Sequence, residues 1–311
     1  MYSGASNLVV TTDNAFLLII GISMFFLIGI SATIIWFIVK YNNKKHPVAE
    51  QIHGSNTLEI VWTVIPLILV MIMFFYGWAG YSPVSKAPKD AMKITAVARM
   101  WSWSFEYNNG VKTDTLYIPQ DKPVILDLIS KDVVHSLYIP AFRIKEDMVP
   151  GRTNRMWFIG QKPGSYELFC AEYCGLSHSY MYTEVKVLTP EKYDDWMASR
   201  SDTTALASAA AVPGALGKRL VELNGCLACH SLDGTKLVGP SFKGVYGHEQ
   251  PVLTDGKKRS IVADDEYIKR SILEPDADVV EGFRKGQMTS YKNQLKDEEI
   301  QQIIDFLKTL Q

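Results

Sequence analysis

Two long stretches without a charged side chain dominate the first 85 residues of this 311-residue chain. They run from Ala15 to Val39 and from Ile60 to Ser85, and each exceeds the roughly 20 apolar residues that a helix needs to cross a bilayer. Because the link between them, Lys40 to Glu59, is short and polar, they predict a transmembrane helical hairpin. A signal peptide followed by one anchor is the alternative, but a charge-free run this long exceeds a usual signal-peptide core.

The charges around the hairpin indicate its orientation. Lys40, Lys44 and Lys45 lie in the link, whereas residues 1–14 contain no lysine or arginine. Positive charge concentrates on the cytoplasmic side of membrane proteins, so we expect both termini on the outer side. The formal net charge of -1 gives the chain no bias toward nucleic acid.

The chain after the hairpin begins with a β-rich part. Short runs of branched and aromatic residues alternate there with Pro and Gly turn signals. Their spacing favours an all-β Greek-key sandwich or barrel. The predicted strands are Met92–Ala98, Val124–Ile129, Arg155–Phe158, Ser165–Phe169 and Thr183–Leu188.

From Pro213 onward the pattern becomes helical. Helices are predicted over Ala215–Asn224, Asp264–Leu273 and Asp297–Leu310, the last with Asp297 as N-cap. The Ser, Thr and Ala residues before this part show no apolar period and indicate a linker. We therefore divide the chain into a hairpin (1–88), a β domain (89–197), a linker (198–212) and an all-α domain (213–311).

The first of two cysteine pairs lies among soft metal ligands. Residues 170–181 contain two thiols, one imidazole and one thioether. Soft sulfur with imidazole favours copper, and two bridging thiolates would need a second imidazole for the second ion. Upstream, and outside the hairpin, only His135 is available. A zinc site and a structural disulfide are the alternatives. The predicted ligands are His135, Cys170, Glu172 through its carbonyl, Cys174, His178 and Met181.

The second cysteine pair forms the motif Cys226-Leu-Ala-Cys229-His230. Such thiols add to the vinyl groups of haem c, and the histidine binds the iron. A redox-active dithiol is the alternative. The haem interpretation also requires flanking helices and a distal ligand, and Met288 is the only methionine after Met197. We therefore predict axial ligation by His230 and Met288.

These motifs resemble the cytochrome c oxidase subunit II family. The matching segments are Val134-His135-Ser136, Asp147-Met-Val-Pro150-Gly151-Arg152 and the Cys-x-Glu-x-Cys-x3-His-x2-Met block. The resemblance runs from the hairpin to about Trp196 and implies a cupredoxin-like fold with a dinuclear copper centre (CuA) on the predicted ligands. It also implies that the Glu172 carboxylate helps to bind magnesium at the contact with subunit I.

Two further residues gain a role only from this resemblance. Trp101 belongs to a run of aromatic residues with a period of two, which a half-buried sheet face explains by itself. The resemblance implies that Trp101 passes electrons to the copper pair, and we expect its indole to be exposed. Glu59 is of the type that anchors a helix end, and the resemblance implies that it marks the entrance of a proton channel in subunit I.

Residues 213–311 resemble a class I cytochrome c domain of the kind fused to subunit II in caa-type haem–copper oxidases. Gly239-Pro240 lies where such domains place a proline whose carbonyl accepts the N–H of the proximal histidine. Thr289 follows Met288 where the family usually has proline, so His248 stays open as an alternative distal ligand.

The two resemblances together imply a function in respiration. Electrons would pass from a donor, such as a cytochrome c or an upstream respiratory complex, through haem c and CuA to subunit I, where oxygen becomes water. The implied partners are subunits I and III and membrane lipid. The implied location is the bacterial inner membrane, with both metal domains on the periplasmic side.

Other classes of protein fit parts of the sequence. A stand-alone membrane-anchored electron carrier would need the same two centres, and sequence alone does not reveal a subunit I. A copper-delivery protein would have no use for the haem motif. A quinol oxidase subunit II lacks the copper ligands that this chain contains.

Overall fold

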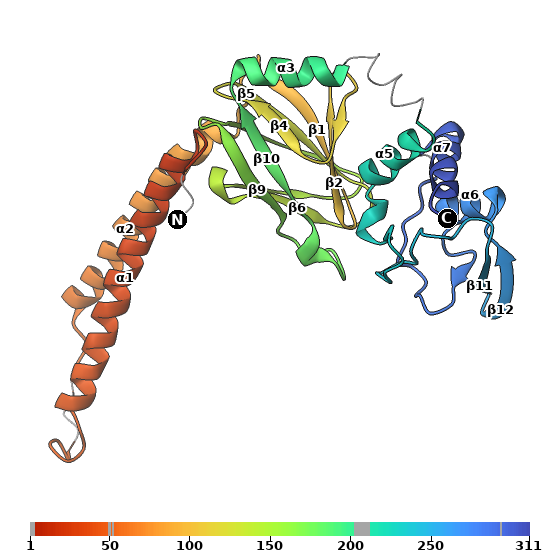
Figure 1. Ribbon diagram of the computed structural model, residues 1–311. Helices are drawn as coiled ribbons and strands as arrows, with labels where there is room; N and C mark the ends of the chain where they lie inside the picture. The colour runs from red at the N-terminus through yellow and green to blue at the C-terminus, as the bar shows by residue number, and fades with distance from the viewer. Residues whose placement is uncertain (1–3, 49–50, 52, 202–211, 293) are drawn as a thin grey trace. The chain divides into compact units, whose positions relative to one another are not determined.

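The computed structural model describes residues 4–48, 51, 53–201, 212–292 and 294–311 (Figure 1). The chain separates into two compact units. One unit comprises Asn7–Pro88, and the other combines Met1–Ser6 with Lys89–Gln311.

The first unit is a helical hairpin. Helix α1 spans Val9–Lys40 and helix α2 spans Asn56–Val84, and Figure 1 shows them running side by side in opposite directions. Both are long and apolar enough to cross a membrane, with a mean hydropathy of 2.5. Helices suit this environment because they satisfy their own backbone hydrogen bonds where lipid offers no partner. The predicted hairpin is confirmed.

The residues that precede α1 belong to the other unit. Ala5 donates its N–H to the carbonyl of Ala141 and accepts one from Gln161, at 3.1 and 2.8 Å. Ser6 forms a β-bridge with Gly160 and is 3% exposed. The segment before the first span is therefore part of the domain that follows the second span. This is incompatible with an α1 that is cleaved away as a signal peptide, because the bonded residues would leave with it.

The β domain contains, among its described residues, two five-stranded sheets. One sheet has the strand order β3-β2-β1-β5-β8, formed by Lys112–Thr113, Ser102–Tyr107, Met92–Arg99, Pro123–Ser130 and Thr153–Ile159. The other has the order β4-β10-β9-β6-β7, formed by Leu116–Pro119, Tyr182–Leu188, Gly164–Cys170, His135–Ile139 and Ile144–Met148. The five strands predicted from sequence lie at β1, β5, β8, β9 and β10.

The two sheets enclose an apolar core. Alternate residues along β2 and β5 are buried, as expected when one face of a strand packs on another layer. The largest fully buried side chains include Phe105, Leu126, Phe142, Phe158 and Leu168. The all-β sandwich expected from the sequence is confirmed.

Helix α3, Pro190–Ser201, closes the β domain. Trp196 of α3 stacks on Tyr117 of β4, with 4.4 Å between ring centroids. The predicted linker begins inside this helix, because residues 198–201 are helical. Most of the rest of the linker, residues 202–211, lies outside the described residues.

The C-terminal domain contains the predicted helices and, in addition, a small sheet. Helices α5, α6 and α7 span Ala215–Leu223, Asp265–Leu273 and Asp297–Lys308. Lys296 rather than Asp297 is the N-cap of α7, and its N–H is bound by Glu299 at 2.8 Å. Among the described residues, β12, β11 and β13 form a three-stranded sheet that the all-α prediction did not include: Lys257–Val262, Glu249–Thr254 and Val279–Val280.

Helices α5 and α7 pack at very close range. A Cβ added to Gly217 of α5 would lie 1.9 Å from the carbonyl oxygen of Gln302 in α7, so this crossing requires glycine. The apolar residues Ile300, Ile303, Ile304 and Leu307 of α7 are buried, and Leu310 beyond its end is partly buried against the same core. The N- and C-terminal helices of the domain thus share one core.

Phe158 provides a test of the β-domain core. Its side chain is fully buried and packs edge-on against Phe142, with 5.2 Å between ring centroids. Phe158→Ala should lower the free energy of unfolding by about 3–5 kcal/mol, because it removes buried apolar area and leaves a cavity. Denaturant titration of the detergent-solubilised chain measures this. Exposed Lys122→Ala should change stability by less than about 0.5 kcal/mol, and equal effects would contradict the described core.

Candidate metal and haem sites

Strand pairing brings the two parts of the candidate copper site together. His135 is the first residue of β6, and Cys170 is the last residue of β9. These strands are antiparallel, with Leu137 opposite Cys170. The N–H of Ala171 also bonds to the carbonyl of Ser136 at 2.9 Å. A histidine 35 residues upstream therefore lies beside the first cysteine.

The remaining candidate ligands lie in the copper loop, which we define as residues 171–181. The N–H of Cys170 bonds to the carbonyl of Met181 at 3.1 Å, and β10 continues antiparallel to β9 from Tyr182. The loop thus starts and ends at one point of the sheet. A short 3-10 turn, His178–Tyr180, directs its last part back toward the cysteines.

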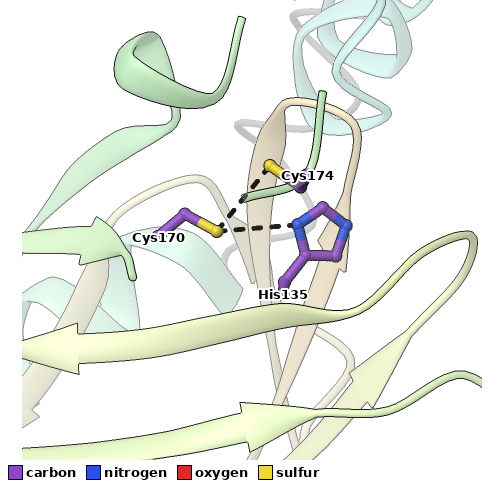
Figure 2. Close-up of side chains that lie close together, drawn as sticks. All are labelled: His135, Cys170 and Cys174. Atoms are coloured by element: carbon purple, nitrogen blue, oxygen red, sulfur yellow. Dashed lines mark hydrogen bonds between the residues drawn. The ribbon is translucent and has the colours of Figure 1, made fainter. Parts of the chain in front are cut away.

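The ligand atoms lie within a few ångströms of one another. The sulfurs of Cys170 and Cys174 are 3.8 Å apart, and Nδ1 of His135 is 3.8 Å from the Cys170 sulfur (Figure 2). These three residues are all buried and their ligand atoms lie within 4.8 Å of one another. Nδ1 of His178 lies 3.5 Å from the Cys174 sulfur.

The two remaining candidates also reach the sulfurs. The thioether sulfur of Met181 is 3.7 Å from the sulfur of Cys174. The carbonyl oxygen of Glu172 is 3.2 Å from the sulfur of Cys170. All six predicted ligands are therefore gathered around one pair of sulfurs, although their role as ligands stays a prediction.

This donor set discriminates among the alternatives from the sequence. Cys170 and Cys174 are free thiols, and their separation of 3.8 Å is far above the ~2.05 Å of a disulfide bond. Each sulfur has its own imidazole, which suits two ions that share both sulfurs. A tetrahedral zinc site would use two thiolates and two imidazoles and leave the thioether without a role. The residues fit a pair of copper ions.

The two thiols influence each other's protonation. Contact with Cys174 lowers the pKa of the Cys170 thiol, and His135 adds to this effect against the opposing effect of burial. The same contact raises the pKa of Cys174. Thiolates are the metal-binding form of cysteine, so the lowered pKa of Cys170 favours metal binding.

Asp132 lies behind His135, on the side away from the sulfurs. Its Oδ1 is 2.8 Å from Nε2 of His135, and its Oδ2 accepts the N–H of Met100 at 2.7 Å. Burial opposes ionisation, but the hydrogen bonds to His135 and to backbone N–H groups lower the pKa of the carboxyl. Asp132 was not among the residues predicted from the sequence, although a carboxylate three positions before a candidate ligand histidine is a recognisable signal.

Two tryptophans attach the copper loop to the opposite sheet. The indole N–H of Trp101 bonds to the carbonyl of Cys174 at 3.1 Å, and that of Trp103 bonds to the carbonyl of Met181 at 3.3 Å. Trp103 belongs to β2, and Trp101 immediately precedes that strand. The expectation that the Trp101 indole is exposed is wrong, because the residue is 6% exposed and lies under the loop.

The second candidate site lies in the C-terminal domain. Cys226 and Cys229 are free and line one cavity together with His230. Burial raises the pKa of Cys226 to about 12 and that of Cys229 to about 11. A redox-active dithiol requires a lowered pKa, so the environment argues against that alternative.

The imidazole of His230 is held in a fixed orientation. Its Nδ1 is 2.7 Å from the carbonyl oxygen of Pro240, and its ring stacks on Phe242 with 4.4 Å between centroids. A Cβ added to Gly239 would lie 2.7 Å from the ring, so glycine is required there. Burial lowers the pKa of His230, which favours the neutral form that binds metals. The contact expected between His230 and Pro240 is present. The stacking of His230 on Phe242 was not predicted from the sequence.

The cavity beside His230 is mostly apolar, as a haem site requires. Met288 lines it, whereas His248 is exposed and does not line it. Nδ1 of His248 lies 3.1 Å from the carbonyl oxygen of Tyr246. The geometry therefore favours Met288 over His248 as the second axial ligand. Apolar residues around the cavity include Val238, Ile268, Ile272, Val280, Phe283, Leu295 and Leu307.

Two candidate acidic residues lie on the surface. The side chain of Glu172 is exposed in the copper loop, and Glu59 is exposed in the first turn of α2. Neither carboxylate is joined to another predicted site residue in the described structure. Their predicted roles both require a partner subunit.

Three family profiles together match most of the chain. "Cytochrome C oxidase subunit II, transmembrane domain" matches residues 3–79, and "Cytochrome C oxidase subunit II, periplasmic domain" matches residues 110–188. "Cytochrome c" matches residues 214–311. These ranges fall within the hairpin, the β domain and the C-terminal domain, and the periplasmic-domain match begins after β1 and β2.

Individual relatives agree with these profiles. A cytochrome c oxidase subunit 2 from Alkalihalophilus pseudofirmus is 29% identical over 94% of this chain and 86% of its own length. One from Metridium senile is 30% identical over 58% of this chain and 82% of its own length. A probable cytochrome c oxidase subunit 2 from Rickettsia bellii is 28% identical over 58% of this chain and 78% of its own length.

Substitution of the two distal candidates tests the haem geometry. Met288→Ala should change the absorption spectrum and lower the reduction potential of the haem, because loss of a thioether ligand removes an interaction that favours reduced iron. His248→Ala should leave both properties unchanged, because that side chain lies outside the cavity. Redox titration of the purified chain measures both variants. The reverse pattern would assign the distal position to His248.

Proposed function

The chain belongs to the cytochrome c oxidase subunit II family, and from this premise we propose which of its residues hold the redox centres. It is a membrane-bound subunit of cytochrome c oxidase and transfers electrons to the oxidase. Its β domain is periplasmic and of the copper-binding type, and a cytochrome c domain is fused to it. The observation that carries the assignment is the pair of sulfurs 3.8 Å apart, each with its own imidazole.

The copper pair is held by side chains from two strands and one loop. His135 and Cys170 approach from paired strands, and Cys174, His178 and Met181 approach from the copper loop. The Glu172 carbonyl completes the set. When bound, a pair of copper ions would supply a one-electron redox couple. The protein contributes a buried, preformed ligand arrangement and excludes bulk water from it.

Cys226 and Cys229 would attach a haem covalently, and His230 and Met288 would bind its iron. Pro240 fixes the plane of the His230 imidazole by accepting its N–H, and an oriented imidazole is a more basic ligand. The apolar cavity wall removes water from around the ring. These residues hold the second one-electron couple of the chain.

Trp101 is the proposed electron donor to the copper centre. Its indole N–H bonds to the backbone of Cys174, whose sulfur is a proposed copper ligand. This gives a path with one hydrogen bond between the ring and a ligand residue. Because Trp101 is buried, this path operates inside the protein rather than from an exposed ring.

Several finer assignments depend on the rest of the oxidase. The chain is part of a haem–copper oxidase complex, and we assign subunits I and III as neighbours and a cytochrome c or an upstream respiratory complex as donor. The exposed Glu172 carboxylate is available for magnesium shared with subunit I. Glu59, at the start of α2, is available at a proton-channel entrance.

Loss of one sulfur tests the electron path. Cys174→Ser in the assembled oxidase should abolish the two-copper signal in electron paramagnetic resonance and stop oxygen consumption, since the second bridge is lost. The haem should still attach and be reduced by the donor, because its ligands lie in another domain. Ser179→Ala, an exposed change in the same loop, is the control. Undiminished oxygen consumption in Cys174→Ser, or zinc in the parent protein, would contradict the proposal.

Cysteine probes test the proposed orientation in a bacterial inner membrane. Asn43→Cys lies in the link between the helices and Lys162→Cys lies on an exposed turn of the β domain. In spheroplasts, a membrane-impermeant thiol reagent should label Lys162→Cys above the parent background and should reach Asn43→Cys only after lysis. Labelling of Asn43→Cys in intact spheroplasts would show that the orientation is the opposite of the proposed one.

A further inference from the structure

Asp132 has an unusual set of hydrogen-bond partners for a side chain that is only 6% exposed. It lies in the turn between β5 and β6. Its Oδ1 accepts the N–H of Val133 at 2.7 Å and lies 2.8 Å from Nε2 of His135. Its Oδ2 accepts the N–H of Met100 at 2.7 Å, across a separation of 32 residues.

All three partners act as donors when His135 binds a metal through its other nitrogen. Two of them are backbone N–H groups, which cannot accept. An ionised carboxylate has only acceptor sites and satisfies all three. An asparagine of the same shape would turn its NH2 group toward either His135 or Met100. A buried donor that faces another donor is left without a hydrogen-bond partner, which is unfavourable.

The same carboxylate therefore fixes two parts of the proposed electron path. It holds Nε2 of His135, so that Nδ1 points to the sulfur of Cys170. It also holds the backbone N–H of Met100, the residue immediately before Trp101. The Trp101 indole is in turn bonded to the carbonyl of Cys174. The contacts thus link the two proposed ligands His135 and Cys174: His135 bonds to Asp132, Asp132 bonds to the backbone of Met100 beside Trp101, and Trp101 bonds to Cys174.

We propose that Asp132 is a positioning residue that holds the copper ligand His135 and the Trp101 segment in register through one acceptor-only group. This inference rests on the proposed function, because it assigns copper to His135 and electron transfer to Trp101. Carboxylates that accept the second N–H of a ligand histidine typically change metal affinity 10–100-fold when they are mutated. Here the Asp132 carboxylate also orients Trp101, the proposed electron donor.

The test uses the full chain in its oxidase with two variants of Asp132. Asp132→Asn keeps the shape and loses the second acceptor, whereas Asp132→Glu keeps the acceptors and changes the length. Asp132→Asn should bind copper about 10–100-fold more weakly in chelator competition, alter the copper paramagnetic resonance spectrum and slow electron transfer from haem to copper. Asp132→Glu should lie closer to the parent in all three measurements.

The control removes the same charge elsewhere in the domain. Asp127→Asn interrupts an ion pair with Arg155 on the partly exposed surface of β5 and should match the parent in all three measurements. The proposal is overturned if Asp132→Asn matches the parent, or if Asp132→Glu performs no better than Asp132→Asn. In the second case, the effect of Asp132 comes from its packing and not from its hydrogen-bond acceptors.

The failure of this proposal can be told apart from failure of the assigned copper centre. If the parent protein binds fewer than two coppers per chain, the assigned function is wrong whatever the variants do. If the parent binds two coppers and Asp132→Asn keeps the same spectrum, affinity and transfer rate, only the role of Asp132 is wrong.

Discussion

The pairing of β9 with β6 on one side and with β10 on the other is the constraint on which the copper site depends. The β6 pairing places His135 beside Cys170, and the β10 pairing returns the copper loop to the strand that it left. Two indole N–H groups from the opposite sheet then bind the loop carbonyls. The arrangement of the sulfurs is therefore a property of the whole sandwich, because each side of the loop is held by a different layer.

The sequence predicted candidate ligands but not the contacts that support them. Thiols, imidazoles and a thioether are rare together, and their spacing predicted a set that the fold brings to one place. Burial depends on which layer covers a strand face, so the period of two in the aromatic run did not reveal that Trp101 is covered. Asp132 was missed for a similar reason, since its bond to Met100 spans 32 residues.

The small sheet of the C-terminal domain was not predicted, although the sequence contains a hairpin signal for it. β11 and β12 are joined by Asp255-Gly256, both with positive φ of 49 and 78°, and this dipeptide is among the strongest hairpin signals. The flanking residues obscured it, because β12 is mostly exposed and starts with three basic residues, so no apolar alternation marks a strand. Arg259 of β12 pairs with buried Asp278, which lines the haem cavity. The hairpin therefore supports the cavity wall through this ion pair as well as through the apolar packing of Val252 and Ile261.

The arrangement of the chain about the membrane follows from three independent observations. The lysines of the link favour its cytoplasmic location. The backbone of Ala5 bonds to the β domain, so the segments before the first span and after the second lie on one side. The proposed haem attachment through Cys226 and Cys229 would require the same side, because haem c is attached outside the bacterial cytoplasm. Because residues 6 and 89 both continue into the hairpin unit, the β domain has two covalent connections to it.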